Sequence, residues 1–473
     1  MYQISCLLSI LCLRLNPEFC DEQTGALNGN SPVKLEAFPV PTNNLNLMKT
    51  QQNRTLGAFE KTFWLLDQID SKDFALAADI EGKAPIEKWE DAIRAVQNRH
   101  QNLSVRIVMD DRFRPILQHV ENLVIPLRVV EAEQAYRWEQ EVEKELSERF
   151  DTAEGPLVRI VLVQKPQTTV LIVVANHTLA DGTSVSYLIR DLLAAVSGKQ
   201  LEKLATQVSN DETLGLPEDQ PVQTAATSPK MEVNSKIVRP LVSSLRFSRE
   251  KTYRILERAR EENTTVHGAI CAGVLMACRK MRGEWSDVKM ELISPICTRG
   301  ALNQNDNFGL NITTHPVFFE NDQQLSFWEL ARLAKAGLEG TFSAVHVKNY
   351  LSFFRELTFG HDDIQQMLDI LKTAFNHQIM VTNLVKVKYD TNFGALQLNS
   401  LYGPMVRSGK GMEQTIGAVT TNGSLSLTNT SDSPIHGLLH EMENILTKAC
   451  KEEGAKTSFP AYEQQEAQNC PLR

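Results

Sequence analysis

The sequence predicts a mixed α/β (α+β) protein built from two halves of similar size. At 473 residues, the chain is longer than one ordinary domain. Runs of β-branched residues, which favour strands, alternate with segments of helical periodicity on both sides of residues 203–235. That stretch contains few large apolar residues and is rich in Pro, Ser, Thr and acidic residues, so it predicts an exposed linker between the halves.

The domain boundaries follow from these shifts in composition. We expect an N-terminal extension over 1–43, an N-terminal half over 44–202, a linker over 203–235, a C-terminal half over 236–455 and a tail over 456–473. The apolar stretch ISCLLSILCL near the N-terminus is too short to span a bilayer, and no Lys or Arg precedes it as in a signal peptide. We therefore favour a disordered extension over a signal or an anchor.

In the N-terminal half, the globular part begins near Arg54, where RTLGAFEKTFWLLDQ alternates apolar and polar residues. The helix over 84–100 has its apolar residues on one face and Pro85 in its first turn. The Glu-rich segment over 135–150 predicts a solvated helix with a Trp on its inner face. The other elements expected here are a helix over 183–198, ended by Gly198, and strands over 103–111, 157–164 and 169–175.

The C-terminal half has the same mixed character. Its segment over 264–281 is apolar all round, which predicts a buried helix, and Cys271 and Cys278 within it should face one packed core. The other expected elements are helices over 247–263, 325–345, 362–376 and 434–450 and strands over 288–296, 311–319, 395–403, 415–421 and 423–430.

Charge and cysteine usage exclude several classes of function. The net charge of −9, the pI near 5.7 and the lack of a basic run argue against a binder of nucleic acid or anionic membranes. The eight cysteines include no CxxC pair and no Cys/His set with zinc-ligand spacing, so no metal site is expected. We expect a monomeric, cytoplasmic protein with no integral membrane segment.

The stretch HTLADG (177–182) carries the clearest chemical signal. The apolar run LIVVA before it has the length of an interior strand, and the helix after it begins with good capping residues. His177 and Asp181 therefore lie on a loop at the carboxyl end of a buried strand, where α/β proteins place reactive groups. A neutral imidazole there can take a proton from a hydroxyl or an amine.

The other residues of this loop leave alternatives open. Asp181 could orient the imidazole or pin the loop through an ion pair elsewhere, and Gly182 permits either a positive φ or a close backbone approach. His177 could also be a structural histidine that caps a strand. A metal site would need a third ligand besides His177 and Asp181, and the sequence offers none.

HTLADG and its surroundings resemble the HHxxxDG signature of the CoA-dependent acyltransferase superfamily. This superfamily includes condensation domains, wax-ester and diacylglycerol acyltransferases, alcohol acetyltransferases and polyketide-associated acyltransferases, and the last two types look closest. The resemblance extends over roughly residues 50 to 450. Further segments resemble the family in the same order: EKTFWLLD, AIRAVQNRHQNLSVRI, FDTAEGPLVRIVLV, TTVHGAICAG, ISPICTRG, MVTNLVKV and FGALQLNSLYGP.

The resemblance implies two chloramphenicol-acetyltransferase-like halves with an active-site tunnel between them. It implies that His177 is the general base on the acceptor, and that Asp181 pairs with Arg299 of the second half to hold the loop in shape. Thr382-Asn383 would stand at the family's Ser-Asn position, where the hydroxyl can face the oxyanion. An acyl-CoA or acyl-carrier thioester would be the co-substrate, with no other cofactor, and an acyl carrier protein would be a further partner.

The chain also departs from the family pattern. Asn176 stands where many relatives have the first histidine, although an amide can still donate a hydrogen bond. Cys297 replaces the aspartate of the Pro-x-Asp-x-Arg segment, so that only Pro295 and Arg299 match. We therefore expect an acyltransferase with an alcohol or amine acceptor, and as the alternative a non-catalytic condensation-like module that binds acyl carriers or protein partners.

Overall fold

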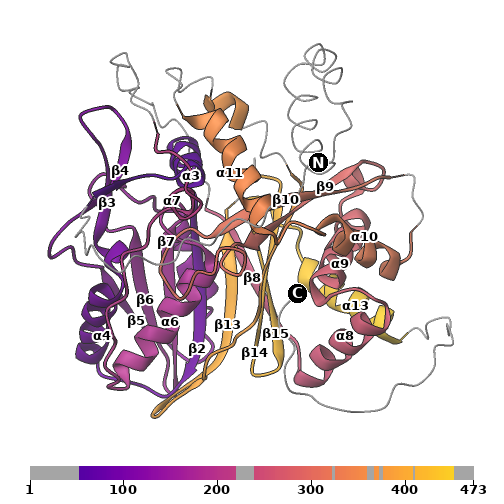
Figure 1. Ribbon diagram of the computed structural model, residues 1–473. Helices are drawn as coiled ribbons and strands as arrows, with labels where there is room; N and C mark the ends of the chain where they lie inside the picture. Colours follow the sequence, from indigo (N-terminus) through magenta and orange to yellow (C-terminus); the bar gives the residue numbers. More distant parts are fainter. Residues whose placement is uncertain are drawn as a thin grey trace, which may run out of the picture.

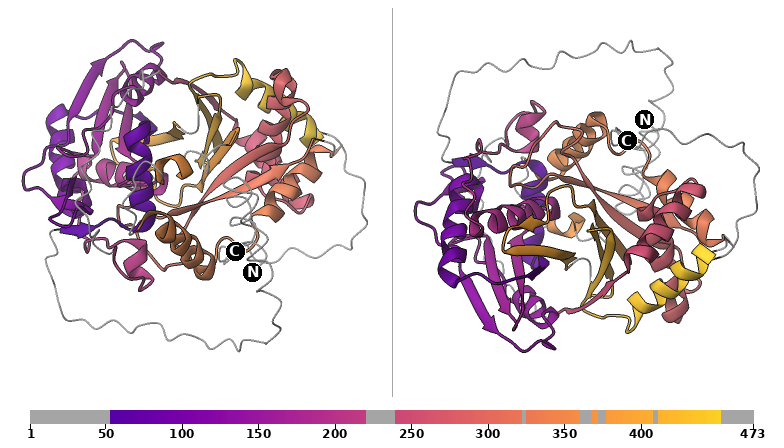
Figure 2. Two further views of the ribbon diagram at one scale, coloured as in Figure 1. Left: turned by 90° about the horizontal axis from the view of Figure 1, so that it is seen from above. Right: turned by 90° about the horizontal axis from the view of Figure 1, so that it is seen from below.

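The computed structural model describes residues 53–219, 239–321, 325–359, 367–371, 377–407 and 411–451. Two six-stranded mixed sheets lie side by side and carry most of the described chain (Figures 1 and 2). The predicted mixed α/β class is confirmed. The extension over 1–43, the tail over 456–473 and most of the helix expected over 362–376 lie outside the described residues.

The first sheet contains the strand that leads to HTLADG. Its central strand β7 is antiparallel to β2 on one side and to β6 on the other, and β7 is buried along nearly its whole length. The strands, in spatial order, are β12 (Asn392–Phe393), β13 (Leu396–Val406), β2 (Asp73–Glu81), β7 (Thr168–Asn176), β6 (Val158–Gln164) and β5 (Leu127–Glu131). The two expected β-branched strands are therefore confirmed as β6 and β7.

Helices pack on this sheet and on each other. The amphipathic helix expected over 84–100 is present as α4 (Ile86–Arg99), and its apolar face, including Trp89, packs toward α6 (Gly182–Val196). Gly198 has a φ of +87° just after α6, as expected of a residue that ends a helix. Shorter elements complete this half: α5 (Glu139–Leu146), the 3₁₀ turn η3 (Gln101–Ser104) and a small sheet of β1 (Asn53–Thr55), β4 (Pro115–His119) and β3 (Val105–Met109).

The second sheet is covered by a layer of helices. Its strands, in spatial order, are β10 (Ile312–Phe319), β9 (Met290–Cys297), β11 (Ile379–Lys386), β14 (Gln414–Thr421), β15 (Ser424–Ser431) and β8 (Leu241–Arg246). The covering elements are α8 (Arg249–Glu261), α9 (Val266–Met281), η4 (Gly283–Trp285), α10 (Phe327–Gly337) and α13 (Leu438–Lys451). As predicted, α9 is a buried helix, and Cys271 and Cys278 lie in the same core.

Two helices lie between the sheets. Residues after β1 form α3 (Ala58–Ile69), which packs against α11 (Ala344–Thr358) of the C-terminal half (Figure 1). Phe59 of α3 contacts Tyr350 and Phe354 of α11, with ring centroids 5.2 Å apart in each pair. These aromatic contacts join the two halves on the side from which α3 approaches β7.

Strand β13 links the halves in a second way. Although it comes late in the chain, it is hydrogen-bonded to β2 of the first sheet. It also passes very close to β14 of the second sheet, since a Cβ added at Gly417 would lie 2.3 Å from the carbonyl oxygen of Pro404. The first sheet is therefore completed by residues from beyond 390, so the sheets do not follow a division of the chain near 203–235.

The structure corrects two expectations about exposure. The expected solvated helix is α5, but its Glu141, Glu143 and Glu145 are buried. Arginine partners permit this burial, because Arg128 and Arg159 each lie 2.8 Å from Glu145. The expected linker is exposed over only part of its described residues, since α7 (Asn210–Thr213) and the residues before it include buried polar side chains: Gln207, Ser209, Asn210 and Asp211.

A membrane-spanning helix must be both long and apolar. Among the helices of the described ranges, none combines the length and the apolarity needed to cross a bilayer.

The contact between β13 and α6 generates a test of packing. A Cβ at Gly182 would lie 2.5 Å from Cγ of Pro404 and 3.1 Å from Cδ2 of Leu384. We expect Gly182→Ala to lower the free energy of unfolding by about 1–3 kcal/mol, measured by urea denaturation, because the strand must shift. Gly283→Ala is the matched control: a Cβ there meets nothing within 4 Å, so a loss above about 0.5 kcal/mol is not expected. Equal losses in the two variants would contradict this account.

Candidate active site

The HTLADG loop is held at both of its ends. The strand β7 ends at Asn176, and the backbone N–H of His177 donates to the carbonyl of Lys72 at 2.9 Å. Asp181 is the N-cap of α6 and accepts a 2.8 Å hydrogen bond from the N–H of Ser184. The loop therefore has a fixed path between a buried strand and a buried helix, as its sequence predicted.

The hydrogen bonds of His177 define its tautomer. Nδ1 lies 3.0 Å from the carbonyl oxygen of Ala180. Because a carbonyl oxygen only accepts hydrogen bonds, Nδ1 carries the proton, and Nε2 of the neutral ring keeps its lone pair. Within the described ranges Nε2 has no hydrogen-bond partner, and the side chain is 7% exposed. A free lone pair on an oriented, neutral imidazole is what a general base requires.

Two aromatic rings enclose the imidazole. Phe63 of α3 stacks on His177 with centroids 4.8 Å apart, and Phe74 of β2 stacks at 4.2 Å. Burial lowers the pKa of His177 to about 4, and the Ala180 hydrogen bond and the Asp181 charge only partly offset it. Nearby Lys72 lowers this pKa further. The ring is therefore neutral at physiological pH, and a proton that it accepts is less stable there than in water.

Asp181 and Arg299 form a buried ion pair across the halves. Nη1 of Arg299 lies 2.9 Å from Oδ2 of Asp181, and both side chains are almost completely inaccessible to solvent. Nη2 of Arg299 donates to Ser184 Oγ at 2.6 Å, and the N–H of Asn311 donates to Asp181 Oδ2 at 2.7 Å. Of the two alternatives for Asp181, the structure therefore shows the one that pins the loop.

Gly182 permits a close approach of neighbouring groups rather than a positive φ. It is not among the described residues with positive φ, and its lack of a side chain instead allows Pro404 and Leu384 to approach closely. Leu384 belongs to β11, so this contact places the end of β11 beside the start of α6.

Asn176 points into a cluster of carboxylates. Its Nδ2 donates to Oδ1 of Asp73 at 2.9 Å and to Oδ1 of Asp67 at 3.2 Å, and its Oδ1 accepts from the N–H of Thr178. Burial and the nearby Asp67 charge raise the pKa of Asp73 to about 7. The side chain of Asn176 therefore joins the ends of α3, β2 and β7. This position calls for a hydrogen-bond donor, which an amide supplies.

Thr382 and Asn383 lie in β11 beside β14. Thr382 is paired with Gly417 in register, and its side chain is largely buried. The Oδ1 of Asn383 accepts a 2.8 Å hydrogen bond from the N–H of Val385, which has a φ of +54°. Asn383 thus stabilises a bulge in β11, and an oxyanion role for Thr382 stays a prediction.

Several residues that shape the site gave no motif signal. Phe63, Phe74 and Asn311 reach the HTLADG loop from three different segments, and in the sequence they are ordinary core or loop residues. His267 and His100 lie elsewhere, His267 bonded to Ser294 and His100 to Asp191. The signal that could have found Phe63 is its place in EKTFWLLD, the first family-like segment.

No metal site is evident in the part of the chain that the structure describes, where no group of three or more His, Cys, Asp or Glu side chains could hold an ion. A cavity of about 300 Å³ lies at the N-terminus of α3, lined among others by Arg54, Asp211 and Arg355. None of its lining residues belongs to the HTLADG loop. The tunnel to His177 stays a prediction.

Two protein families match the sequence. The condensation domain matches residues 64–210, and the C-terminus of the phthiocerol/phthiodiolone dimycocerosyl transferase matches residues 236–304. The first match includes HTLADG and the second includes Arg299, so both partners of the ion pair fall within matched regions.

Curated relatives cover the chain in part. Surfactin synthase subunit 2 of Bacillus subtilis is 24% identical over 305 residues, which are 59% of this chain and 8% of that protein. Bacitracin synthase 2 of Bacillus licheniformis is 26% identical over 162 residues, 31% of this chain and 6% of that protein. The chain therefore spans less than a tenth of the length of these relatives.

Solved structures share the fold over most of the chain. Polyketide synthase associated protein 5 from Mycobacterium tuberculosis has a TM-score of 0.60 at 15% identity, covering 85% of this chain and 99% of that chain. The first condensation domain of the CDA synthetase also has a TM-score of 0.60 at 15% identity, covering 84% of this chain and 95% of that one. At this level of identity the similarity shows the fold.

The enclosure of His177 predicts that its imidazole titrates at a lower pH than a free histidine. We expect an NMR pH titration of its imidazole Cε1–H to give a pKa of about 4, below the ordinary value near 6.5, with His177→Gln identifying the resonance. The unfolded chain then binds a proton that the folded chain does not, so stability should fall as the pH drops from 6.5 toward 4. A pKa near 6.5 would show that the two rings do not exclude water.

The buried ion pair predicts a loss of stability. Arg299→Ala leaves the Asp181 carboxylate without its charged partner, so we expect a loss of about 3–5 kcal/mol in the free energy of unfolding. Arg254→Ala removes an exposed pair with Glu250 and should cost less than about 0.5 kcal/mol. Thermal and urea unfolding of both variants measure the difference. An unshifted melting temperature for Arg299→Ala would contradict the structural role of the pair.

Proposed function

Because the chain belongs to the CoA-dependent acyltransferase superfamily, we propose that it transfers an acyl group from a thioester donor to an alcohol or amine acceptor. The donor is an acyl-CoA or a carrier-bound acyl thioester. The observation that carries this proposal is the free lone pair on Nε2 of His177, a neutral and oriented base at the end of a buried strand.

The proposed reaction needs one base and no redox step. Nε2 of His177 takes the proton of the acceptor's hydroxyl or amine as that atom attacks the thioester carbonyl carbon. The tetrahedral intermediate carries a negative oxygen, to which the Thr382 hydroxyl donates a hydrogen bond. Collapse of the intermediate breaks the carbon–sulfur bond, and the departing thiolate takes the proton from the imidazolium. The products are an ester or amide and a free thiol.

The surroundings of His177 support the proton transfer. Burial lowers the pKa of His177 to about 4, so the imidazole is in its unprotonated form at neutral pH, as a general base requires. The carbonyl of Ala180 and the charge of Asp181 both stabilise the imidazolium that forms during the attack. The low pKa favours return of the proton to the leaving thiolate in the second step.

We also propose a path for the substrates, a macromolecular donor and a cellular setting. We place the tunnel for donor and acceptor between the halves, where α3, β7 and α6 of one half meet β11 and α11 of the other. An acyl carrier protein is the proposed macromolecular donor, and the similarity to surfactin synthase subunit 2 and bacitracin synthase 2 supports this choice. Cys271 and Cys278 are buried free thiols, which supports a reducing, cytoplasmic setting. The oligomeric state that we propose is a monomer.

The test is release of free thiol from a panel of acyl-CoA and carrier-bound donors, each offered alcohol and amine acceptors. We expect His177→Ala to lower kcat/KM by about 10²–10⁴-fold, because a general base contributes that much. His440→Ala, an exposed histidine on α13, is the control and should keep the wild-type rate. If the wild type consumes no donor while still binding an acyl carrier, the chain is a non-catalytic binding module.

A further inference from the structure

The segment over 207–211, which belongs to the crossover between the halves, contacts helix α3 and also Asn311, a hydrogen-bond donor to Asp181. We propose that Gln207 and Asp211, together called the crossover brace, are positioning residues that keep the His177 imidazole in place. The brace makes two contacts, called its two arms: Asp211 binds the start of α3, and Gln207 binds Asn311, whose N–H donates to Asp181. This inference rests on the proposed role of His177 as the base.

The first arm caps helix α3. Oδ2 of Asp211 accepts a 3.0 Å hydrogen bond from the N–H of Ala58, the first residue of α3. The helix lacks a capping side chain of its own at this position, because its N-cap is Gly57. A Cβ on Gly57 would lie 2.6 Å from that same Oδ2, so the glycine makes room for a cap supplied from 153 residues further along the chain.

Helix α3 connects this cap to the imidazole, because its Phe63 stacks on His177. Phe63, which stacks on His177, lies five residues from Ala58, or about 8 Å along the helix axis. At the other end of the helix, Asp67 accepts hydrogen bonds from the N–H of Lys72 and from Asn176. The helix is thus fixed at both ends by groups outside it, and the ring that covers His177 lies between them.

The second arm supports Asp181. Nε2 of Gln207 donates to Oδ1 of Asn311 at 2.7 Å, and the N–H of Asn311 donates to Asp181. Gly309 lets the Gln207 side chain pass, since a Cβ there would lie 2.7 Å from it. The brace therefore also contacts the residue that gives Asp181 its second donor from the C-terminal half.

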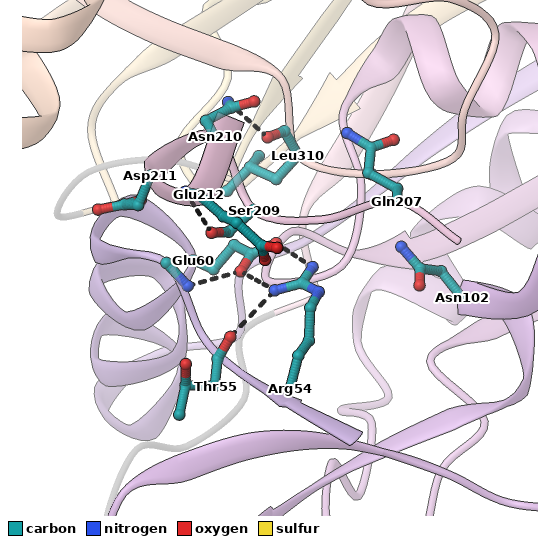
Figure 3. Close-up of polar contacts among 12 residues, drawn as sticks. Arg54, Thr55, Glu60, Asn102, Gln207, Ser209, Asn210, Asp211, Glu212 and Leu310 are labelled. Carbon is teal, nitrogen blue, oxygen red and sulfur yellow. Dashed lines mark hydrogen bonds and ion pairs between the residues drawn. The ribbon is translucent and has the colours of Figure 1, made fainter. Parts of the chain in front are cut away.

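The burial of the brace supports a specific role. Figure 3 shows Ser209 and Asp211 near the N-terminal end of α3, Asn210 beside Leu310, and Gln207 on the other side of Leu310. Asn210 donates to the carbonyl of Leu310 at 3.2 Å, and Asp211 also pairs with Arg355 of α11 at 3.4 Å. A flexible tether would have no need of buried polar side chains with partners in both halves.

The experiment compares three variants by NMR of His177. Asp211→Ala removes the cap, and Gly57→Ala displaces it without changing any charge. In both we expect the His177 pKa to rise by at least one unit from about 4, together with a smaller ring-current shift of its Cε1–H. Asp211→Asn keeps an oxygen acceptor for Ala58 and should restore both values. These readouts need no substrate, so they hold even if the proposed acyl transfer fails.

Control and contrary outcomes separate positioning from general stability. Glu145 pairs with Arg128 and Arg159 and does not belong to the contacts of α3. Glu145→Ala should therefore lower the melting temperature and leave the His177 pKa unchanged. The proposal is overturned if Asp211→Ala and Gly57→Ala lower the melting temperature but keep the wild-type pKa and shift. Should Asp211→Ala not fold, Gly57→Ala alone decides the outcome. In an active enzyme, kcat should fall in both variants and recover in Asp211→Asn.

Discussion

Asp181 carries a carboxylate charge in a place that water does not reach, and the junction between the halves is organised around that charge. A buried carboxylate is tolerated only when several donors surround it. Here the donors come from the start of α6, from Arg299 after β9 and from the backbone before β10. Because these segments belong to both halves, satisfying one carboxylate fixes how the halves meet. His177, four residues earlier on the same short loop, is fixed as a consequence.

The position of His177 combines orientation with weak basicity. Two stacked rings and a bonded Nδ1 leave the imidazole little freedom to rotate, while the same rings remove the water that would stabilise its charged form. In the proposed reaction, such an imidazole has a lowered proton affinity but needs no reorganisation when the acceptor arrives. Next to the loop, Asn176 bridges Asp67 and Asp73 and so holds the ends of α3, β2 and β7 together.

Local patterns predicted what depends on local sequence. Strands β6 and β7, helices α4, α6 and α9 and the loop that holds His177 follow from periodicity and capping residues, and the family resemblance brought Asp181 together with Arg299. Contacts between distant segments were missed. Nothing near residues 392–406 indicates that β13 joins the first sheet, and polar composition made the crossover look exposed although its side chains have buried partners. The contacts of Phe63 and Phe74 with His177 were likewise missed, because a phenylalanine that covers a histidine has the same local pattern as one in any core.

The placement of β13 also bears on how this chain can be divided or recombined. A fragment ending at 219 would contain β2 without the neighbour that covers its outer edge, leaving a row of unpaired N–H and C=O groups open to aggregation. A chimera that joins the first half of this chain to the second half of a relative would receive a foreign β13, matched to another sheet. Exchange of specificity between such proteins therefore requires residues 392–406 to travel with the N-terminal half, as a separate insert taken from the same parent.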